Sequence, residues 1–534
     1  MTSTQDGEPP HAAEEQESHQ PKISVAQPLD GTSNVSDNSP EKMTRKLLKE
    51  AAIAESSKNY STVEKVDEDY AELRASYQSF KTLPISFRLN QLNALLRLFT
   101  EGEQDICAAL YQDLHRNMPT AYMTEIGLVK AEITEAIKNL KTWMTPVGVS
   151  TPMMHIPGLT KSKIFYEPLG LALIMSPWNY PVLLAMQPLV GAIAAGCCVC
   201  VKPSTISCHV SDTLARLAAK YLDTSCYKVI TGTHEISDKL LSLKWDAIFF
   251  TGSATIGKHV MRAAAEHLCP VTLELGGKSP VIIDASANLD VTARRLAMGR
   301  YMNAGQTCVA PDYVMCASSI KDKLIDKLKK CIVDFYGDDQ QKSDDYARIV
   351  ATRQFSRLVG LLRDEGWSTE QGAEKQLCFG GVSDEDDLYI QPTILSCSID
   401  TDTAFLREEI FGPILPIVSF PDDQLALLAA QHINSHPKPL AMYVFSGNAQ
   451  LKEYLQTHTS SGSLSFNECV LQLSIPSLPF GGVGESGMGS YHEKKTFEAF
   501  SHAKPILDKT NAFDIGARYP PYTDGKLSTI KKFL

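Results

Sequence analysis

A cysteine in a glycine-containing loop is the residue of this chain best suited to covalent chemistry. The segment Asn303-Ala304-Gly305-Gln306-Thr307-Cys308 follows a helical stretch, so we expect the Cys308 thiol to be accessible, unlike cysteines in buried strands. A cysteine thiolate attacks electrophilic carbon and forms a covalent intermediate. Among 13 cysteines, Cys308 is therefore the candidate nucleophile.

A carboxylate inside an apolar strand is the second candidate. Glu274 stands between Leu273 and Leu275 and is followed by two glycines. Burying such a group is costly unless the group has a role. Because burial disfavours the charged form, the pKa of Glu274 is expected to rise, which suits a general base.

A rigid loop carries a candidate hydrogen-bond donor. In Ser176-Pro177-Trp178-Asn179-Tyr180-Pro181, two prolines bracket the Asn179 amide and fix its direction. An asparagine at the end of a strand is more often a turn residue, and the loop alone favours that simpler interpretation.

Two further strand-end loops are candidates for binding a nucleotide. Lys202 and Ser204 follow an apolar strand, where they suit ribose hydroxyls or a phosphate, although a lysine is more often a solvated surface charge. Gly252, Ser253 and Gly257 form a glycine turn that opens a helix, which can offer backbone N–H groups to a pyrophosphate. Their spacing differs from the dinucleotide fingerprint, so this signal is weak by itself.

The elements that must position these residues alternate between strand and helix from Gly170 onward. This alternation predicts an α/β fold with a doubly wound parallel sheet and a ligand site at the carboxyl ends of its strands. Strands are expected at 171–175, 199–202, 228–231 and 247–251, with helices at 186–195, 211–221, 237–243 and 255–267.

The rest of the chain divides by composition and periodicity. Helical spacing of apolar residues predicts a helical region over 67–143, and short extended segments over 147–167 predict a projecting hairpin that contacts another subunit, a surface loop being the alternative. The expected organisation is a disordered extension (1–65, with a short helix over 41–55), a cofactor-binding domain (66–146 and 168–278), an oligomerisation hairpin (147–167), a catalytic domain (279–466) and a carboxyl-terminal oligomerisation segment and tail (467–534).

Composition excludes several classes of protein. The net charge is -11 and no basic block is present, which argues against nucleic-acid binding. The cysteines have no partners at zinc-site spacing, so no metal is expected, and without a signal peptide they should remain reduced. The most apolar run, 189–201, is too short for a transmembrane segment.

Taken together, the motifs resemble the aldehyde dehydrogenase superfamily over roughly residues 70–522. The signatures Glu-Leu-Gly-Gly-Lys (274–278) and Gly-Gln-x-Cys (305–308) occur in the family's order, followed by Glu409-Ile410-Phe411-Gly412-Pro413 and Pro479-Phe480-Gly481-Gly482. Segments 309–313, 263–265, 439–441 and 487–492 resemble its class 3 and fatty aldehyde branch, and more narrowly fungal members that act on long-chain fatty aldehydes or apocarotenals.

The resemblance implies a role for each candidate. Cys308 would attack the aldehyde, Asn179 and the Cys308 backbone N–H would bind the oxyanion, and Glu274 would activate water. Cofactor contacts would come from the following residues: Glu409 and Phe411 at the nicotinamide and its ribose, Lys202 and Ser204 at the adenosine ribose, and Gly252, Ser253 and Gly257 at the pyrophosphate.

The resemblance also implies a cofactor, a substrate and an assembly. NAD is expected, and NADP stays open because Thr205 stands where many relatives have a glutamate that would repel a 2′-phosphate. The substrate would be a long apolar aldehyde in a pocket with walls from helices, with Tyr122 and Met123 as candidates. A cytoplasmic homodimer is expected, with a basic, apolar tail that could touch a membrane surface. Two rival functions are a non-catalytic scaffold and a coenzyme A-acylating dehydrogenase.

Overall fold

A six-stranded sheet carries most of the loops singled out above. The structure is a computed structural model that describes residues 44–152, 155, 160–512 and 514–533. The strands are β3 (Leu171–Met175), β4 (Cys198–Lys202), β5 (Tyr227–Val229), β6 (Ala247–Thr251), β7 (Val271–Glu274) and β17 (Gly487–Met488). Their order is β17-β7-β6-β3-β4-β5, and only β17 is antiparallel to its neighbour. The four strands predicted between residues 171 and 251 are confirmed.

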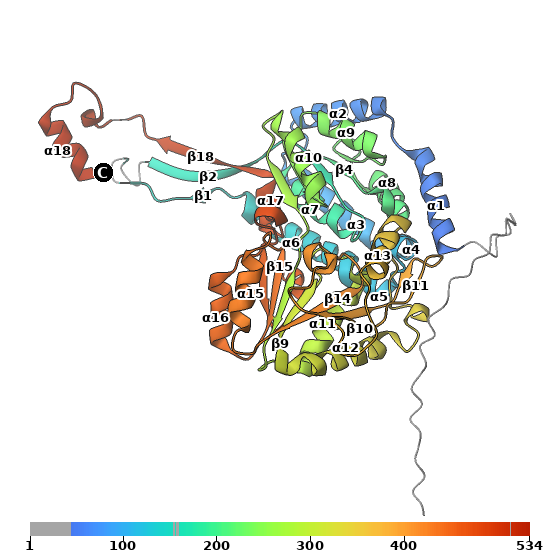
Figure 1. Ribbon diagram of the computed structural model, residues 1–534. Helices are drawn as coiled ribbons and strands as arrows, with labels where there is room; N and C mark the ends of the chain where they lie inside the picture. Colours follow the sequence, from blue (N-terminus) through green and yellow to red (C-terminus); the bar gives the residue numbers. More distant parts are fainter. Residues whose placement is uncertain (1–43, 153–154, 156–159, 513, 534) are drawn as a thin grey trace, which may run out of the picture. The chain divides into compact units, whose positions relative to one another are not determined.

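The strand order reverses between β3 and β6, and this reversal places the ligand crevice. The chain runs outward through β4 and β5 and then returns to β6 and β7 on the other side of β3. Because such crossovers are right-handed, the outward and returning helices cover opposite faces of the sheet. These helices are α7 (Leu183–Ala195), α8 (Cys208–Tyr221), α9 (His234–Ser242) and α10 (Ala254–Ala265) (Figure 1).

The predicted helical region before the sheet is also present. It consists of α2 (Val63–Gln78), α3 (Ile85–Glu101), α4 (Glu103–Leu114), α5 (Met118–Ala121), a π-helical turn (Tyr122–Ile126) and α6 (Gly127–Met144). Leu92, Leu95 and Phe99 of α3 are fully buried, as their helical spacing predicts. Helix α3 packs against α6, α7 and α8, whereas α2 packs against α9, β3 and β4, so the region contributes to both faces of the sheet.

A second sheet of seven strands follows in the sequence. Its order is β10-β13-β14-β9-β8-β15-β16, and only β10 is antiparallel to its neighbour. The strands are β8 (Pro280–Ile283), β9 (Tyr313–Ala317), β10 (Lys375–Phe379), β13 (Thr393–Cys397), β14 (Ile414–Phe420), β15 (Ala441–Phe445) and β16 (Ser463–Phe466); a small hairpin joins β11 (Ser383–Asp384) to β12 (Tyr389–Ile390). Its helices are α11 (Leu289–Tyr301), α12 (Lys321–Tyr336), α13 (Thr352–Asp364), α14 (Ala404–Arg407), α15 (Leu425–Asn434) and α16 (Ala449–His458).

The predicted hairpin contains a third strand from the far end of the sequence. Strand β2 (Thr160–Pro168) pairs with the short β1 (Val147–Gly148) and, along its whole length, with β18 (Ser501–Lys509) (Figure 1). Most of the side chains in this three-stranded sheet are exposed or half-buried, so it has no core of its own. Helices α17 (Lys494–Ala499) and α18 (Asp524–Phe533) precede and follow β18.

The amino-terminal expectation needs a correction. Residues 1–43 lie outside the described residues, but the remainder of the predicted disordered extension is folded, beginning with α1 (Arg45–Ser56). Thr44 caps this helix, and Lys49 is buried where its ammonium contacts the carboxylate of Asp113. The short helix expected over 41–55 is therefore present, and a buried ion pair, which composition does not reveal, holds it against α4.

No helix in the described ranges is both long enough and apolar enough to cross a bilayer.

Candidate active site

The loop after β3 places Asn179 at the reversal point between β3 and β6. Asn179 is buried, and its Nδ2 donates to the carbonyl oxygen of Gln306 at 3.1 Å. Its own carbonyl oxygen accepts from Nδ2 of Asn303 at 3.0 Å and from the guanidinium of Arg116. A carboxamide nitrogen carries two hydrogens, so one N–H of Asn179 remains for a ligand.

The chain before Cys308 bends through three consecutive left-handed residues. These are Asn303 (φ 56°), Ala304 (φ 50°) and Gly305 (φ 73°). Non-glycine residues hold this conformation only where the surroundings over-determine it. An ideal Cβ on Gly305 would lie 2.1 Å from the carbonyl oxygen of Gly412, so this position accepts only glycine without movement.

The Gln306 side chain fixes the same bend from within. Its Nε2 donates to the carbonyl oxygens of Asn303 and Arg348, each at 3.0 Å, and its Oε1 accepts from the N–H of Val350 at 3.0 Å. Gln306 is fully buried. The Gln306 side chain therefore holds residues 303–308, which we call the nucleophile loop, against the segment around residue 348.

Arg116 connects the two loops, and no sequence motif indicated it. Its Nε donates to Oδ1 of Asn303 at 3.0 Å, and its other nitrogens contact the Asn179 carbonyl oxygen and the carboxylate of Glu125. The guanidinium lies over the ring of Tyr180, 4.4 Å from its centroid. A buried charge needs such partners, and here they are the groups that hold Cys308 and Asn179 near each other.

Glu274 ends β7, next to the antiparallel strand β17. Gly487 of β17 is its register partner, and the Glu274 side chain is buried. Neither carboxyl oxygen has a hydrogen-bond partner among the described residues. Burial raises the pKa of Glu274 well above its ordinary value, which favours the protonated form.

Cys308 lies where two cavities meet. The thiol is partly exposed, and both a smaller and a larger cavity include it in their walls. Burial, followed by the charges of Glu409 and Glu274, raises the pKa of Cys308 to about 12. The thiol is therefore neutral at rest, and its reaction requires removal of the proton.

The smaller cavity has a volume of about 200 Å³ and contains six of the predicted residues besides Cys308. Its walls include Asn179, Gly252, Ser253, Glu274, Glu409 and Phe411. Oε1 of Glu409 has no partner among the described residues, and an ideal Cβ on Gly276 would lie 2.2 Å from its Oε2. A buried carboxyl with a free oxygen fits the hydroxyls of a nicotinamide ribose. Burial raises the pKa of Glu409 to about 8.

The remaining predicted cofactor residues do not line this cavity, but they lie at the same edge of the sheet. Lys202 ends β4, is buried, and donates from Nζ only to the Pro203 carbonyl oxygen, at 2.9 Å. Ser204 accepts from the N–H of Ile206, and Gly257 is buried in the first turns of α10. Ser253 caps α10, so the amino terminus of this helix faces the cavity wall.

Lys278 and Asp312 tie three segments of the site together. Nζ of Lys278 donates to Oδ2 of Asp312 at 2.7 Å, and Arg300 donates to Oδ1 of Asp312 at 3.0 Å. The N–H of Ile410 also donates to Asp312, at 3.2 Å. Asp312 therefore fixes Glu409, one residue earlier, relative to the nucleophile loop. The Glu-Leu-Gly-Gly-Lys signature contains Lys278, but it does not indicate Asp312 as the partner.

The second cavity is apolar and larger, with a volume of about 500 Å³. Its size is typical of a site for a small molecule. Met123 lines it as expected, whereas Tyr122 does not appear in its wall. The other wall residues are mostly aliphatic or aromatic and include Leu128, Leu183, Met298, Val309, Phe335 and Val470.

The residues that sequence reasoning missed share a property. Arg116, Asn303 and Asp312 are all buried and polar, and each bonds to segments distant in the sequence. Asn303 and Asp312 flank the cysteine signature, so their polarity beside a catalytic loop was a usable signal. Arg116 follows a helix end among polar residues, where nothing distinguishes it from a surface arginine.

We predict that Gly305→Ala displaces the nucleophile loop, because the new Cβ clashes with the backbone of Gly412. Gly366→Ala is the control, since Gly366 also has a positive φ (68°) but nothing lies within 4 Å of its Cβ position. The control should lose about 1 kcal/mol of unfolding free energy, and Gly305→Ala should lose roughly 2 kcal/mol more. Denaturant unfolding measures both, and equal losses would contradict the clash.

Comparison with known proteins identifies the family to which these features belong. The model of the aldehyde dehydrogenase family matches residues 46–506. A dimeric NADP-preferring aldehyde dehydrogenase of Canis lupus familiaris is 43% identical over 461 residues, which cover 86% of this chain and 98% of the relative. The 4,4'-diaponeurosporen-aldehyde dehydrogenase of Staphylococcus aureus is 43% identical over 470 residues, covering 88% and 99%.

A solved structure agrees with the fold. The substrate-bound state of Staphylococcus aureus AldH superposes with a TM-score of 0.83 at 42% identity, and the match covers 88% of this chain and 99% of that one. The predicted α/β fold is confirmed. The chain belongs to the aldehyde dehydrogenase family, in its class 3 and fatty aldehyde branch, and is an NAD(P)-dependent enzyme that oxidises an aldehyde to a carboxylic acid.

Proposed function

We propose that Cys308 performs this oxidation on a long apolar aldehyde, with Asn179 and Glu274 as its catalytic partners. The observation that carries the proposal is the position of Cys308 in the walls of two cavities, a larger apolar one and a smaller one that contains the carboxyl groups of Glu274 and Glu409. An aldehyde chain fits the first cavity and the cofactor fits the second. The reacting carbon would then lie at the sulfur.

The first half of the reaction forms a bond to sulfur. The Cys308 thiol loses its proton to solvent water, sulfur bonds to the aldehyde carbon, and the carbonyl oxygen becomes an oxyanion. The free N–H of Asn179 and the backbone N–H of Cys308 donate to this oxygen. Bound NAD(P) supplies the hydride acceptor. Loss of hydride from carbon leaves a thioester on Cys308.

The second half releases the acid. Glu274, once ionised, takes a proton from a water molecule whose oxygen attacks the thioester carbon. The carbon–sulfur bond then breaks, which yields a carboxylic acid and regenerates Cys308. A buried carboxyl without other partners suits this role, and it favours hydrolysis over transfer of the acyl group to coenzyme A.

Cofactor binding rests on the strand-end residues. We propose that Glu409 and Phe411 hold the nicotinamide side, that Gly252, Ser253 and Gly257 face the pyrophosphate, and that Lys202 and Ser204 hold the adenosine ribose. Burial lowers the pKa of Lys202 to about 8, so a bound anion would favour its charged form. Thr205 carries no charge to repel a 2′-phosphate, and a relative is named NADP-preferring.

We propose further that the enzyme is a cytoplasmic homodimer. The three-stranded sheet exposes Val147, Phe165 and Leu507 without a core of its own, which suits an intersubunit contact, and one relative is named dimeric. All 13 cysteines are free, as in a reducing compartment. Lys531 and Lys532 on α18 beside the exposed Leu527 would allow peripheral contact with an anionic membrane.

Replacing the nucleophile should abolish the first turnover. Cys308→Ala should form no burst of reduced cofactor with any aldehyde, because no sulfur is present to form the hemiacetal. Cys378→Ala changes another partly exposed cysteine, on β10, and should retain the burst. Stopped-flow absorbance measures both. A folded wild type without a burst would favour the scaffold function, and acyl-coenzyme A as product would favour the acylating one.

Replacing the base should separate the two halves of the reaction. Glu274→Gln should keep the burst but slow steady-state turnover by about 10²-fold, a typical contribution of a general base. The control Glu132→Gln alters another buried carboxyl, whose pKa burial raises to about 7, outside both cavities. An unchanged steady-state rate in Glu274→Gln would exclude Glu274 as the base.

The same shifts predict a pH dependence. Because the pKa values of Cys308 and Glu274 are raised, their active, ionised forms increase with pH. In the wild type, kcat/KM should therefore rise between about pH 6 and pH 9 through Cys308, and kcat should rise over the same range through Glu274. A rate that falls over this range would contradict the assignment.

The apolar cavity predicts a preference for long chains. Across saturated aldehydes from short to long and an apocarotenal, kcat/KM should increase with chain length as more apolar surface is buried. Met298→Trp, which reduces the cavity, should lower kcat/KM for the long substrates only. Met261→Trp, on the exposed face of α10, should change neither. A preference for acetaldehyde would contradict the proposal.

A further inference from the structure

Helix α1 is fastened to two separate parts of the molecule. From Lys49 onward it contacts helices of the first region, through Lys49 to Asp113 of α4 and through Ser56 to Asp212 of α8, the latter at 3.0 Å. Its amino-terminal half contacts the β11–β12 hairpin of the second region. There the backbone N–H of Lys46 donates to the Asp386 carbonyl oxygen at 3.1 Å. The helix therefore bridges the two regions between which the active site lies.

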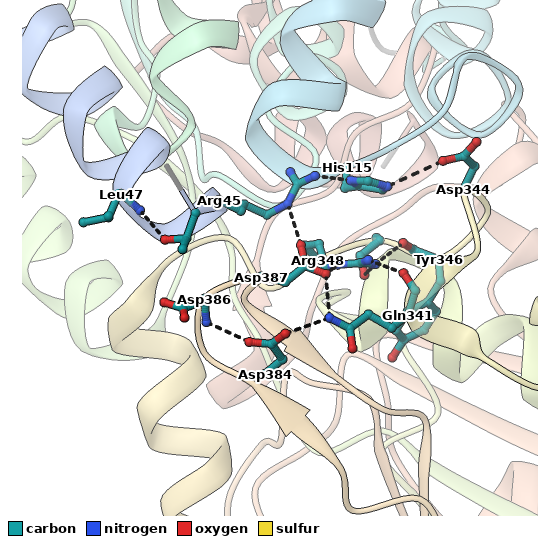
Figure 2. A network of polar contacts seen from close by, with 12 residues as sticks. Arg45, Leu47, His115, Gln341, Asp344, Tyr346, Arg348, Asp384, Asp386 and Asp387 are labelled. Atoms are coloured by element: carbon teal, nitrogen blue, oxygen red, sulfur yellow. Dashed lines mark hydrogen bonds and ion pairs between the residues drawn. The ribbon is translucent and has the colours of Figure 1, made fainter. Parts of the chain in front are cut away.

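Arg45 makes the central contact at the hairpin. Its Nε donates to Oδ1 of Asp387 at 3.1 Å, and another nitrogen contacts Nδ1 of His115 (Figure 2). Burial and the adjacent guanidinium groups lower the pKa of His115 to about 4, so its ring is neutral and accepts this bond. One side chain of α1 therefore connects the hairpin to the end of α4.

Asp387 also binds a buried arginine, Arg348. Its second oxygen, Oδ2, accepts from Nε of Arg348 at 2.7 Å and from Nε2 of Gln341 at 3.2 Å. Arg348 is 3% exposed and donates further to the carbonyl oxygens of Tyr346, at 2.9 Å, and Gln341, at 2.5 Å. Figure 2 shows these bonds closing the chain into a compact turn around the guanidinium.

The backbone of this turn holds the nucleophile loop. The carbonyl oxygen of Arg348 accepts from Nε2 of Gln306, and the N–H of Val350 donates to Oε1 of Gln306. The Gln306 carbonyl oxygen in turn accepts from Asn179. Cys308 follows two residues later. A continuous hydrogen-bonded path, Arg45–Asp387–Arg348–Gln306, therefore runs from α1 to the loop of the nucleophile.

A second branch reaches the same loop. His115, bonded to Arg45, immediately precedes Arg116, which contacts Asn303 and Asn179. The N–H of Arg348 also donates to the Leu114 carbonyl oxygen at 3.0 Å, which joins the two branches. Both routes end on the groups that orient Cys308 and the oxyanion donor.

We propose that Arg348 is a positioning residue for the nucleophile loop and that Arg45 of α1 acts on the reaction through it. Arg45 touches neither cavity, so its effect is on the alignment of Cys308 and Asn179 alone. Misplacement of reacting groups by about 1 Å can cost up to about 10²-fold in rate. The inference rests on the proposed role of Cys308.

A purely stabilising function of α1 is the competing explanation, and the neighbouring residue separates the two. Lys46 lies on the same helix and reaches the same hairpin, where its Nζ donates to Oε1 of Glu385 at 2.5 Å. Glu385 makes no side-chain bond to Arg348. Loss of either ion pair loosens α1 from the hairpin, but only loss of Arg45 interrupts the path to Gln306.

The test compares Arg45→Ala, Asp387→Asn and the control Lys46→Ala in the full chain. We expect the first two to lower kcat by about tenfold while KM for the aldehyde changes by less than about twofold. Lys46→Ala should retain the wild-type kcat. Arg45→Lys can still form an ion pair with Asp387 and should have a kcat between those of Arg45→Ala and the wild type. The double variant Arg45→Ala/Asp387→Asn should be no slower than either of its single variants, because both changes interrupt the same path.

Hydrogen exchange provides a readout that does not depend on turnover. Peptides covering residues 301–312 should exchange faster in Arg45→Ala, by at least about threefold, and remain unchanged in Lys46→Ala. Equal exchange and equal kcat in the two alanine variants would overturn the proposal. If the wild type formed no burst of reduced cofactor, the proposed function would fail instead, and the exchange experiment would still test the path.

Discussion

The candidate site depends on hydrogen bonds to the backbone of residues 303–308, where three consecutive residues, 303–305, have left-handed φ values. The backbone groups of such a loop cannot pair within a helix or a sheet and need other partners. Asn303, Gln306 and Asn179 satisfy those groups with carboxamides, and Arg116 adds a charge that is neutralised nearby. Carboxamides both donate and accept, so each one crosslinks two segments. The positions of the thiol and of the oxyanion donor follow from this network, because the same bonds hold both loops.

Burial has a second effect, which is chemical. The pKa values of Cys308, Glu274 and Glu409 are all raised, chiefly by desolvation. The resting site therefore contains little net charge, and it is assembled from acids that ionise when the reaction requires it. Charged pairs are confined to the layer behind, where Arg116 meets Glu125 and Arg300 meets Asp312. The residues that hold the loops in place are therefore charged, whereas burial favours the neutral forms of Cys308 and Glu274.

Much of the fold and of the placement of the candidate site residues was predictable from sequence. The strands that carry Asn179, Lys202 and Gly252 occur where the alternation of apolar segments predicts them, because fully buried parallel strands leave a clear local pattern. Six of the predicted site residues besides Cys308 line one cavity. The narrower fungal origin and the domain boundaries stay predictions.

What could not be predicted was every contact between distant segments. Arg116, Asp312, Arg348 and Arg45 read as ordinary charged residues in the sequence, and only tertiary structure shows which partner each one has. For the same reason, the sequence did not indicate that α1 packs against the folded region or that β18 pairs with β2. Local pattern encodes burial and period, but not the identity of a partner several hundred residues away.

The short strand β17 has a consequence for how the protein is made. It lies beside the strand that ends in Glu274, yet it consists of residues 487 and 488, near the end of the chain. During synthesis, the first sheet can assemble from β3 to β7 long before its outer edge is covered. A nascent chain therefore carries an open sheet edge beside Glu274 until β17 has been synthesised. Products truncated before β17 leave this edge uncovered even when the first sheet has folded.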